Sequence, residues 1–217
     1  MKSIKHICLF IALVSSVLIS NAQSFKKGSF LLSISEGSTR ANYSTSNNFT
    51  HSMVNSDMDG VRDPLFIEYG ISNKWGIGLS TGNDLFNVDS KKFYGFNTEN
   101  NKPLSVKTSE FTFDLNYHLF SSKRTDFSLY GSIGSFGVSY SEKVGNANYT
   151  YQSKGGIVRV GGKLRYYFWK RLGVMAMYSL YSANSSPVIR PTISEAPNYS
   201  TQIKGSAFEF GLCFRFF

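Results

Sequence analysis

The sequence predicts an all-β fold in which eight antiparallel strands close into an up-and-down transmembrane barrel. Three observations support this prediction: apolar residues recur at every second position along most of the chain, short and long connections alternate, and the chain ends in the aromatic stretch FEFGLCFRFF. Alternation with a period of two is typical of strands that have one apolar and one polar face. A barrel that spans a membrane combines such strands with short turns on one side and long loops on the other.

The first 22 residues have the composition of a secretory signal peptide. The stretch MKSIKHICLFIALVSSVLISNAQ begins with lysines, continues with an apolar run over residues 7–19 and ends with small residues before Gln23. A basic start, an apolar stretch of about 7–15 residues and a small-residue cleavage site define such peptides. The run is shorter than the about 20 residues that a spanning helix needs. We therefore expect residues 1–22 to be removed and residues 23–217 to form one barrel domain.

Six segments show the alternation most clearly. The stretch EFTFDLNYHLF places Phe111, Phe113 and Leu115 on one face and polar residues on the other. The same pattern predicts strands around residues 30–34, 65–71, 75–81, 158–168 and 172–180, each with its apolar face outward. Residues 127–140 form an ambiguous strand, because their glycines allow a bulge and a change of face near Gly134. The terminal stretch completes the eight strands.

The connections between these strands fall into two classes. Tight turns are expected at residues 72–74, 121–126 and 170–171. Long polar loops, rich in Asn and Ser, are expected at residues 43–62, 84–103, 142–154 and 183–199. Both chain ends lie on the side of the short turns, so the turns are expected to face the periplasm and the loops to face outside. A hairpin hidden in the first long loop would raise the number of strands to ten.

The terminal strand carries a family resemblance. A sheet in lipid must close on itself, because every backbone polar group needs a partner, so the last strand is expected to pair with the first. The chain resembles the small eight-stranded outer-membrane barrels of the OmpX/OmpA type, often grouped as porin-family proteins of the Gram-negative envelope. The resemblance implies a C-terminal signal read by the barrel-assembly machinery, made of Phe208, Phe210, Leu212, Phe214, Phe216 and Phe217. By alternation Phe216 faces outward and Phe217 lies one position beyond, which leaves the register of the last strand open.

The inward faces of the predicted strands carry charged residues of both signs in equal number. They are Glu68, Glu110, Asp114, Arg159, Lys163, Arg165, Glu209 and Arg215. Eight strands enclose an interior just wide enough for side chains, and an isolated buried charge is very costly. We therefore predict that these residues form an ion-paired plug in the lumen. A gated, narrow ion path is the alternative.

A second group of charged residues lies at the turns and is called the basic collar here. It consists of Lys26, Lys27, Lys74, Lys123, Arg124, Lys170 and Arg171, opposed only by Asp126. The collar supplies most of the net charge of +9. Basic residues near an anionic membrane surface gain about 1 kcal/mol each, so contact with inner-leaflet headgroups is favoured over turns that are merely solubilised. A groove for nucleic acid would combine cations with aromatic platforms, which this distribution does not do.

Two short patterns suggest sites but have simpler explanations. The stretch NSDMDG at residues 55–60 begins like a calcium loop, yet Phe66 stands where the twelfth-position acid is required, which favours a polar loop. His118 followed by Ser121 suggests a hydrolase, but no arrangement of base and nucleophile is visible. A hydrogen-bonded histidine near the turns is favoured.

The remaining candidates are sulfur-containing residues and one loop. Met175 and Met177 point inward and are interpreted as packing residues, because thioethers alone are a weak copper signal. Cys213 is the only cysteine after the signal peptide; it also points inward and is expected to be inert. The loop SSPVIRPTISEAP either recognises a partner or is simply stiffened by its prolines.

These observations favour a non-enzymatic outer-membrane protein with a structural or surface-interaction role through its extracellular loops. A narrow porin-like channel for ions or small solutes is the alternative, and a lipid-modifying enzyme is a lesser one. The expected partners are outer-membrane lipid, the assembly machinery and a possible surface ligand of the loops. No cofactor, metal or nucleic acid is expected.

Overall fold

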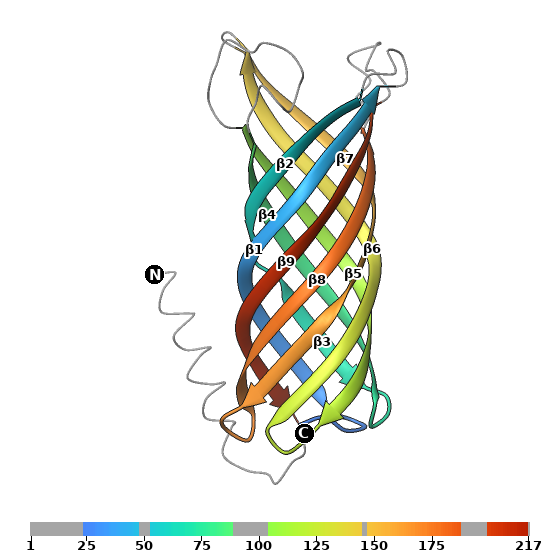
Figure 1. Ribbon diagram of the computed structural model, residues 1–217, viewed down its shortest axis with the longest axis vertical. Helices are drawn as coiled ribbons and strands as arrows, with labels where there is room; N and C mark the ends of the chain where they lie inside the picture. The colour runs from blue at the N-terminus through green and yellow to red at the C-terminus, as the bar shows by residue number, and fades with distance from the viewer. Residues whose placement is uncertain (1–23, 48–52, 89–103, 145–146, 188–198, 217) are drawn as a thin grey trace.

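The computed structural model describes residues 24–47, 53–88, 104–144, 147–187 and 199–216. These residues form a tall, closed tube of tilted strands, with the short turns at one end, called the turn end, and the opposite ends of the strands at the other, called the loop end (Figure 1). The strands are β1 (Phe30–Asn47), β2 (Met53–Arg62), β3 (Leu65–Gly70), β4 (Trp75–Val88), β5 (Leu104–Ser121), β6 (Thr125–Val144), β7 (Ala147–Tyr167), β8 (Leu172–Pro187) and β9 (Tyr199–Phe216). None of the described residues belongs to a helix long and apolar enough to cross a membrane.

β2 and β3 are two parts of one barrel strand, so the ring has eight strands as predicted. Both parts pair with β1 on one side and β4 on the other, and the register does not change from one part to the other. The interruption lies at Asp63 and Pro64, because proline has no N–H to donate to the ladder. Ser35 N still donates to Pro64 O at 3.1 Å, and Asp63 N donates to Asn83 O at 3.1 Å.

The first and last strands close the barrel. β1 pairs with β9 in an unbroken antiparallel ladder from Phe30 opposite Phe216 to Asn47 opposite Tyr199. This pairing fixes the register of the last strand, which alternation alone had left open. Phe217 lies outside the described residues.

The register around the ring sets the width of the tube. A path of paired residues that starts at Ile34 runs through Leu65, Thr81, Phe111, Ser135, Gly156, Asn184 and Gln202 and returns to β1 at Ser44. The path therefore climbs ten residues toward the long connections in one circuit. A stagger of this size in eight strands corresponds to a tilt of about 40° and an interior that side chains fill.

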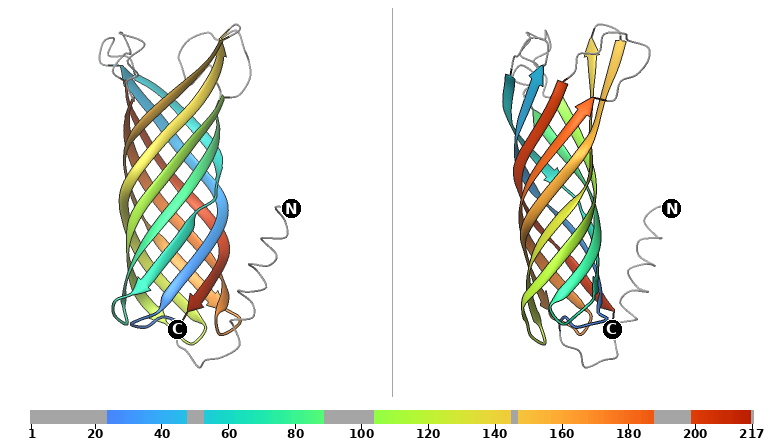
Figure 2. Two further views of the ribbon diagram at one scale, coloured as in Figure 1. Left: turned by 180° about the vertical axis from the view of Figure 1, so that it is seen from behind. Right: turned by 90° about the vertical axis from the view of Figure 1, so that its right-hand side faces the viewer.

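The strands continue well beyond the predicted boundaries, which corrects the four long loops. β1 runs to Asn47 and β2 begins at Met53, so most of residues 43–62 is strand, including the NSDMDG stretch. The predicted loop 142–154 was wrong, because β6 and β7 form a hairpin that pairs up to Val144 opposite Ala147. The two views of Figure 2 show this hairpin projecting at the end of the tube. Residues 1–23 and most of the fourth loop, residues 188–198, lie outside the described residues.

The two halves of the tube have opposite hydrophobic patterns. In the half next to the short turns, called the turn half, outward residues such as Phe111, Phe113 and Leu115 are apolar and exposed, while charged residues face inward. In the loop half, outward residues such as Asn42 and Ser105 are polar. Its inward residues form an apolar core of Ala41, Tyr43, Met58, Phe86, Val88, Val106, Phe136, Val138, Ile157, Tyr181, Ala183 and Ile203.

Residues 127–140, whose outward face the sequence left ambiguous, keep one alternation of inward and outward residues along β6. Tyr130, Ser132 and Phe136 all point inward and are buried, so the change of face that the glycines allow near Gly134 does not occur. The register shift lies instead on β5 between His118 and Phe120. A bulge at the end of a strand is favoured near the rim of a barrel, where it ends the regular pairing.

Candidate functional site in the lumen

All eight predicted lumen residues are buried inside the tube, each with at most 5 % of its surface exposed. They come from β3, β5, β7 and β9, which all run from the loop end toward the turn end. The neighbouring strand β4 turns Gly76, Gly78, Ser80 and Gly82 toward the interior. This small face leaves room for the long arginine and glutamate side chains opposite.

An upper cluster is centred on Arg62, which the sequence reasoning had placed at the edge of a loop. Arg62 Nη1 donates to Asp84 Oδ1 at 2.9 Å and Nε donates to Glu209 Oε1 at 2.9 Å, while Nη2 contacts Glu110. Arg159 Nη2 donates to the second oxygen of Glu110 at 2.8 Å. The cluster joins β2, β4, β5, β7 and β9 at the boundary between the two halves.

Arg62 and Asp84 could have been found from the sequence by extending the alternation. Arg62 continues the inward positions of Phe66 and Glu68, and Asp84 continues those of Ser80 and Gly82. Both were assigned to loops because they lie at the edges of long polar stretches rich in Asn and Ser.

A lower cluster near the turns combines Glu68, Asp126, Arg165 and His118. Arg165 donates to Glu68 at 2.6 Å and to Asp126 at 2.8 Å. His118 Nε2 lies 2.7 Å from Glu68 Oε1, and Nδ1 lies 2.7 Å from Asp126 Oδ1. A neutral imidazole has a single N–H, so both contacts are hydrogen bonds only when the ring is an imidazolium. Asp126, which was expected to oppose the collar, belongs to this buried cluster instead.

The segment before β1 closes the turn end of the lumen. The Phe25 ring stacks on the His118 ring with centroids 3.3 Å apart and planes 10° apart. Phe25 N donates to Ser121 Oγ at 3.0 Å, and Gly28 N donates to Gly70 O at 2.7 Å. Gly28 has φ +83°, a conformation that favours glycine and allows the chain to turn into β1. Residues 24–29 are called the strap here.

The same contacts exclude a nucleophile–base pair at His118 and Ser121. Both ring nitrogens of His118 face carboxylates, and Ser121 Oγ is hydrogen-bonded to Ser24 Oγ at 2.6 Å. A nucleophile and its base must share a hydrogen bond or a close approach. The two residues are therefore structural in this arrangement.

Three predicted lumen residues do not join the two clusters. Asp114 accepts hydrogen bonds from Ser80 at 3.2 Å and Thr112 at 3.0 Å. Lys163 donates to Asn116 Oδ1 at 3.1 Å, and its ammonium lies 4.2 Å from the centre of the Tyr130 ring. Arg215 lies over the Tyr167 ring, at 4.5 Å from its centre. These residues are held by neutral polar groups and rings.

With every buried carboxylate ionised, the described lumen is electroneutral only if His118 is charged. Its buried carboxylates are Glu68, Asp84, Glu110, Asp114, Asp126 and Glu209. Its buried Lys and Arg side chains are Arg62, Arg159, Lys163, Arg165 and Arg215. The six acids therefore exceed the five bases by one, and a protonated His118 supplies the missing charge.

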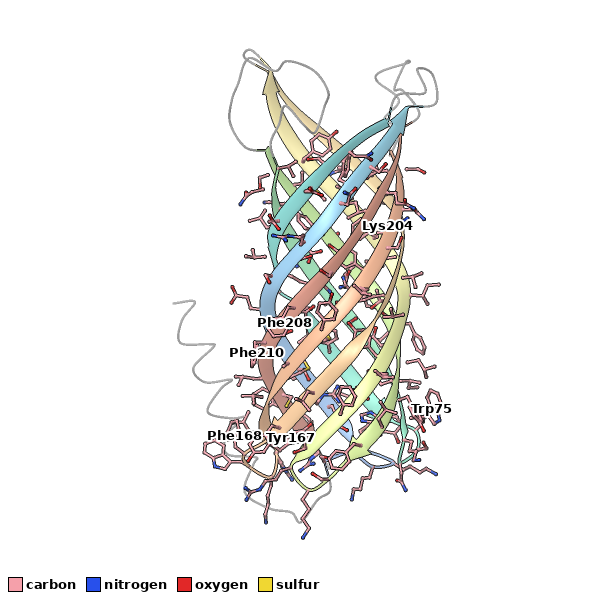
Figure 3. The ribbon with its side chains drawn as sticks, viewed as in Figure 1. Trp75, Tyr167, Phe168, Lys204, Phe208 and Phe210 are labelled. Atoms are coloured by element: carbon pink, nitrogen blue, oxygen red, sulfur yellow. The ribbon has the colours of Figure 1, made fainter. Side chains whose placement is uncertain are left out.

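The collar lies at the turn end of the barrel, beyond the apolar outward face. Of its seven residues six are exposed and Arg171 is half-buried. Figure 3 shows Trp75, Phe168 and Tyr167 on the elements just above these turns, where Trp75 and Phe168 point outward and Tyr167 is buried. On β9 the terminal aromatics Phe208 and Phe210 face outward and are exposed.

The comparisons with known proteins concern the fold. No protein-family model matches the chain, and no protein of curated function matches it in sequence. The outer membrane protein OprG from Pseudomonas aeruginosa is similar in structure, with a TM-score of 0.55, 13 % identity and coverage of 88 % of this chain and 97 % of that one. The structure of the outer membrane protein AlkL in lipid bilayers also gives a TM-score of 0.55 at 13 % identity. The match covers 91 % of this chain and 94 % of that one. The predicted fold, a small closed β-barrel of the kind found in these outer-membrane proteins, is confirmed.

Proposed function

We propose that this protein is a non-enzymatic integral outer-membrane protein whose barrel is a closed anchor rather than a pore. The observation that carries the proposal is the filled lumen. The strap, two ion-pair clusters and an apolar core follow one another from the turn end to the loop end. A structural or surface-interaction role would then belong to the outer surface and the connections of the loop half.

The apolar face of the turn half supports the location in a membrane. Every strand of this half turns exposed apolar residues outward, among them Ile34, Leu79, Leu129, Val160 and Phe210. Soluble monomers rarely expose contiguous apolar surface on this scale. A signal peptide over residues 1–22 would direct the chain to the envelope, where the basic collar would contact inner-leaflet headgroups.

A bilayer recording tests the closed barrel. The chain lacking residues 1–22 is refolded into lipid vesicles, folding is verified by heat-modifiable gel migration, and the vesicles are fused with a planar bilayer. We expect a folded protein without discrete current steps. A general porin in the same bilayer serves as the positive control. Steady steps from the folded protein would overturn the proposal.

A narrow channel is the second candidate, because part of the lumen has the character of a hydrated space. Asn116 Nδ2, Ser128 Oγ and Ser132 Oγ are buried and have no hydrogen-bond partner among the described residues. Buried polar atoms of this kind are usually paired with ordered water. The apolar core of the loop half stands between this region and the outside, so Phe86→Ala and Phe136→Ala together are the variant most expected to conduct if a path exists.

A further inference from the structure

We propose that Lys107, Lys154 and Lys204 form a binding surface for the phosphate groups of an anionic glycolipid in the outer leaflet. The proposal rests on the membrane placement given under the proposed function. It adds a specific ligand class and a specific face of the barrel. The three residues are called the lysine crown here.

The crown follows a pattern that repeats on three strands. Each lysine precedes the first outward apolar residue of its strand by four positions, with one small outward residue between them. The three sets are Lys107–Ser109–Phe111 on β5, Lys154–Gly156–Val158 on β7 and Lys204–Ser206–Phe208 on β9. In Figure 3, Lys204 lies above Phe208 and Phe210 on the outside of the tube.

The register places the three lysines at nearly the same height. Lys107 is linked through Ser139 to Gln152 on β7, and Lys204 is linked through Ser182 to Val158 on β7. Because paired positions rise by ten residues over eight strands, the residue paired across two strands lies about two to three residues nearer the loop end. Gln152 is therefore about two to three residues higher than Lys107, and Lys204 is higher than Val158 by the same amount. Both Lys107 and Lys204 then lie within about two residues of the height of Lys154.

The height of the crown is that of a headgroup layer. Four residues of a strand tilted by about 40° rise by roughly 10 Å along the barrel axis. The lysines therefore stand roughly 10 Å above the last apolar residues, outside the hydrocarbon and at the level of polar headgroups.

The electrostatics of the crown favour an anion. The three lysines are exposed, and within the described parts of the chain none of them forms an ion pair with a carboxylate. By contrast, the outward Arg40 on β1 donates to Asp59 at 2.7 Å. The β1–β4 side of the barrel turns Glu36, Asp57 and Asp63 outward, so among the described residues of the loop half the outward cations without a carboxylate partner lie on β5–β9.

The spacing of the lysines favours a ligand with more than one phosphate. Neighbouring lysines are two strands apart, which corresponds to roughly 10 Å across the sheet. At this spacing each lysine can contact a separate phosphate of one headgroup. The strands between them carry small or polar outward residues, Gly137 and Ser139 on β6 and Ser182 and Asn184 on β8, so a sugar headgroup can approach the sheet.

The test compares lipid binding to two matched variants. The wild-type barrel, the variant K107Q/K154Q/K204Q and the control R40Q, which removes an outward cation of the loop half that already pairs with Asp59, are each folded into nanodiscs of zwitterionic lipid. Binding of a bisphosphorylated glycolipid is measured by native mass spectrometry and by the shift in thermal midpoint. The crown variant is expected to lose at least ten-fold in affinity, while the control variant retains wild-type binding.

Three results would overturn the inference. The first is equal binding by the crown variant and the wild type. The second is undiminished wild-type binding of the same glycolipid after removal of its phosphates. The third is equal wild-type binding of phosphatidylglycerol, which would indicate a general preference for anionic lipid. If the wild-type chain does not insert into lipid at all, the proposed function fails instead, so the two failures are distinguishable.

Discussion

At the scale of single residues, glycines that face the lumen leave the space that long charged side chains occupy. A Cβ at Gly82 would lie 3.0 Å from Arg62 Nη2, and a Cβ at Gly76 would lie 2.3 Å from Glu68 Oε1. The missing side chains leave space for both carboxylate–guanidinium clusters inside a narrow tube. Charges in such an interior have lost their hydration. Their ion pairs are therefore favourable only when each charged group meets opposite charges and hydrogen-bond partners.

Arg62 provides the clearest test of this dependence. Arg62→Ala would leave Asp84, Glu110 and Glu209 with one guanidinium fewer, and we expect the free energy of unfolding to fall by about 3–5 kcal/mol. Urea titration of the barrel in lipid vesicles, followed by tryptophan fluorescence, measures the change.

The matched control is Arg40→Ala. Arg40 also pairs with an aspartate at 2.7 Å, but the side chains of this pair are 78 % and 71 % exposed. Exposed pairs contribute little to stability, so this variant should unfold like the wild type. Equal stability of both variants would contradict the role assigned to the upper cluster.

The charge of His118 can be tested by a double-mutant cycle. His118→Gln removes a positive charge between two carboxylates and should destabilise the barrel, whereas His118→Gln combined with Asp126→Asn restores neutrality. We expect the double variant to be more stable than the sum of the single effects predicts, with a coupling of about 0.5–3 kcal/mol. Additive effects in urea titrations would mean that the ring is neutral in the folded protein.

At the scale of elements, the strap is the only described segment outside the strands and turns that fills the lumen. It reaches the interior through Phe25, which has 2 % of its surface exposed, and through Ser24, whose hydroxyl donates to Thr125 O at 2.9 Å. The strap precedes β1 and forms hydrogen bonds with Gly70 at the end of β3 and with Ser121 at the end of β5. It therefore crosses the turn end of the barrel and joins separate strands there.

Phe25→Ala should weaken this end of the barrel. Truncation of a buried phenylalanine typically costs about 3–5 kcal/mol, and removal of the ring also exposes the His118 cluster to water. The measurement is the thermal midpoint, together with proteolysis near residue 26. Phe120→Ala is the control, because Phe120 is 57 % exposed on the outer wall. A Phe25 variant as stable and protease-resistant as the control would contradict the capping role of the strap.

At the scale of the whole molecule, the barrel joins a membrane-type half to a half built like a soluble protein. In the turn half apolar groups face outward and charges are satisfied inside, while in the loop half this order is reversed. The physical reason is the solvent outside: lipid removes the penalty for exposed apolar groups, and water restores it. One set of continuous strands meets both conditions by changing which of its two faces is apolar.

This reversal predicts opposite tolerance to charge in the two halves of β5. Val106→Lys would place an unpaired ammonium in the apolar core of the loop half and should prevent stable folding, whereas Ser105→Lys, one residue earlier and outward, should be neutral. Leu115→Lys on the outward face of the turn half should cost about 2–4 kcal/mol. Urea titrations of the three variants in vesicles test the pattern, and a Val106 variant as stable as the Ser105 variant would contradict it.

The sequence by itself determined the class of fold and the membrane-type half, because alternation depends only on neighbours along the chain. Phe111, Phe113 and Leu115 against Glu110, Thr112 and Asp114 suffice to define two faces of a strand, and a sheet in lipid then has to close. The same alternation correctly placed the inward charges on four strands. It failed in the loop half, where outward Ser, Asn and Asp residues resemble those of a loop.

Only the tertiary structure decided which inward residues meet. The contacts of Arg62 with Asp84, Glu110 and Glu209 depend on the ten-residue stagger around the ring, since a different stagger would bring other positions to the same height. The contacts of His118 with Glu68, Asp126 and the Phe25 ring likewise join four separate segments. Alternation gives the face of a residue, whereas its height and partners are set by closure of the whole barrel.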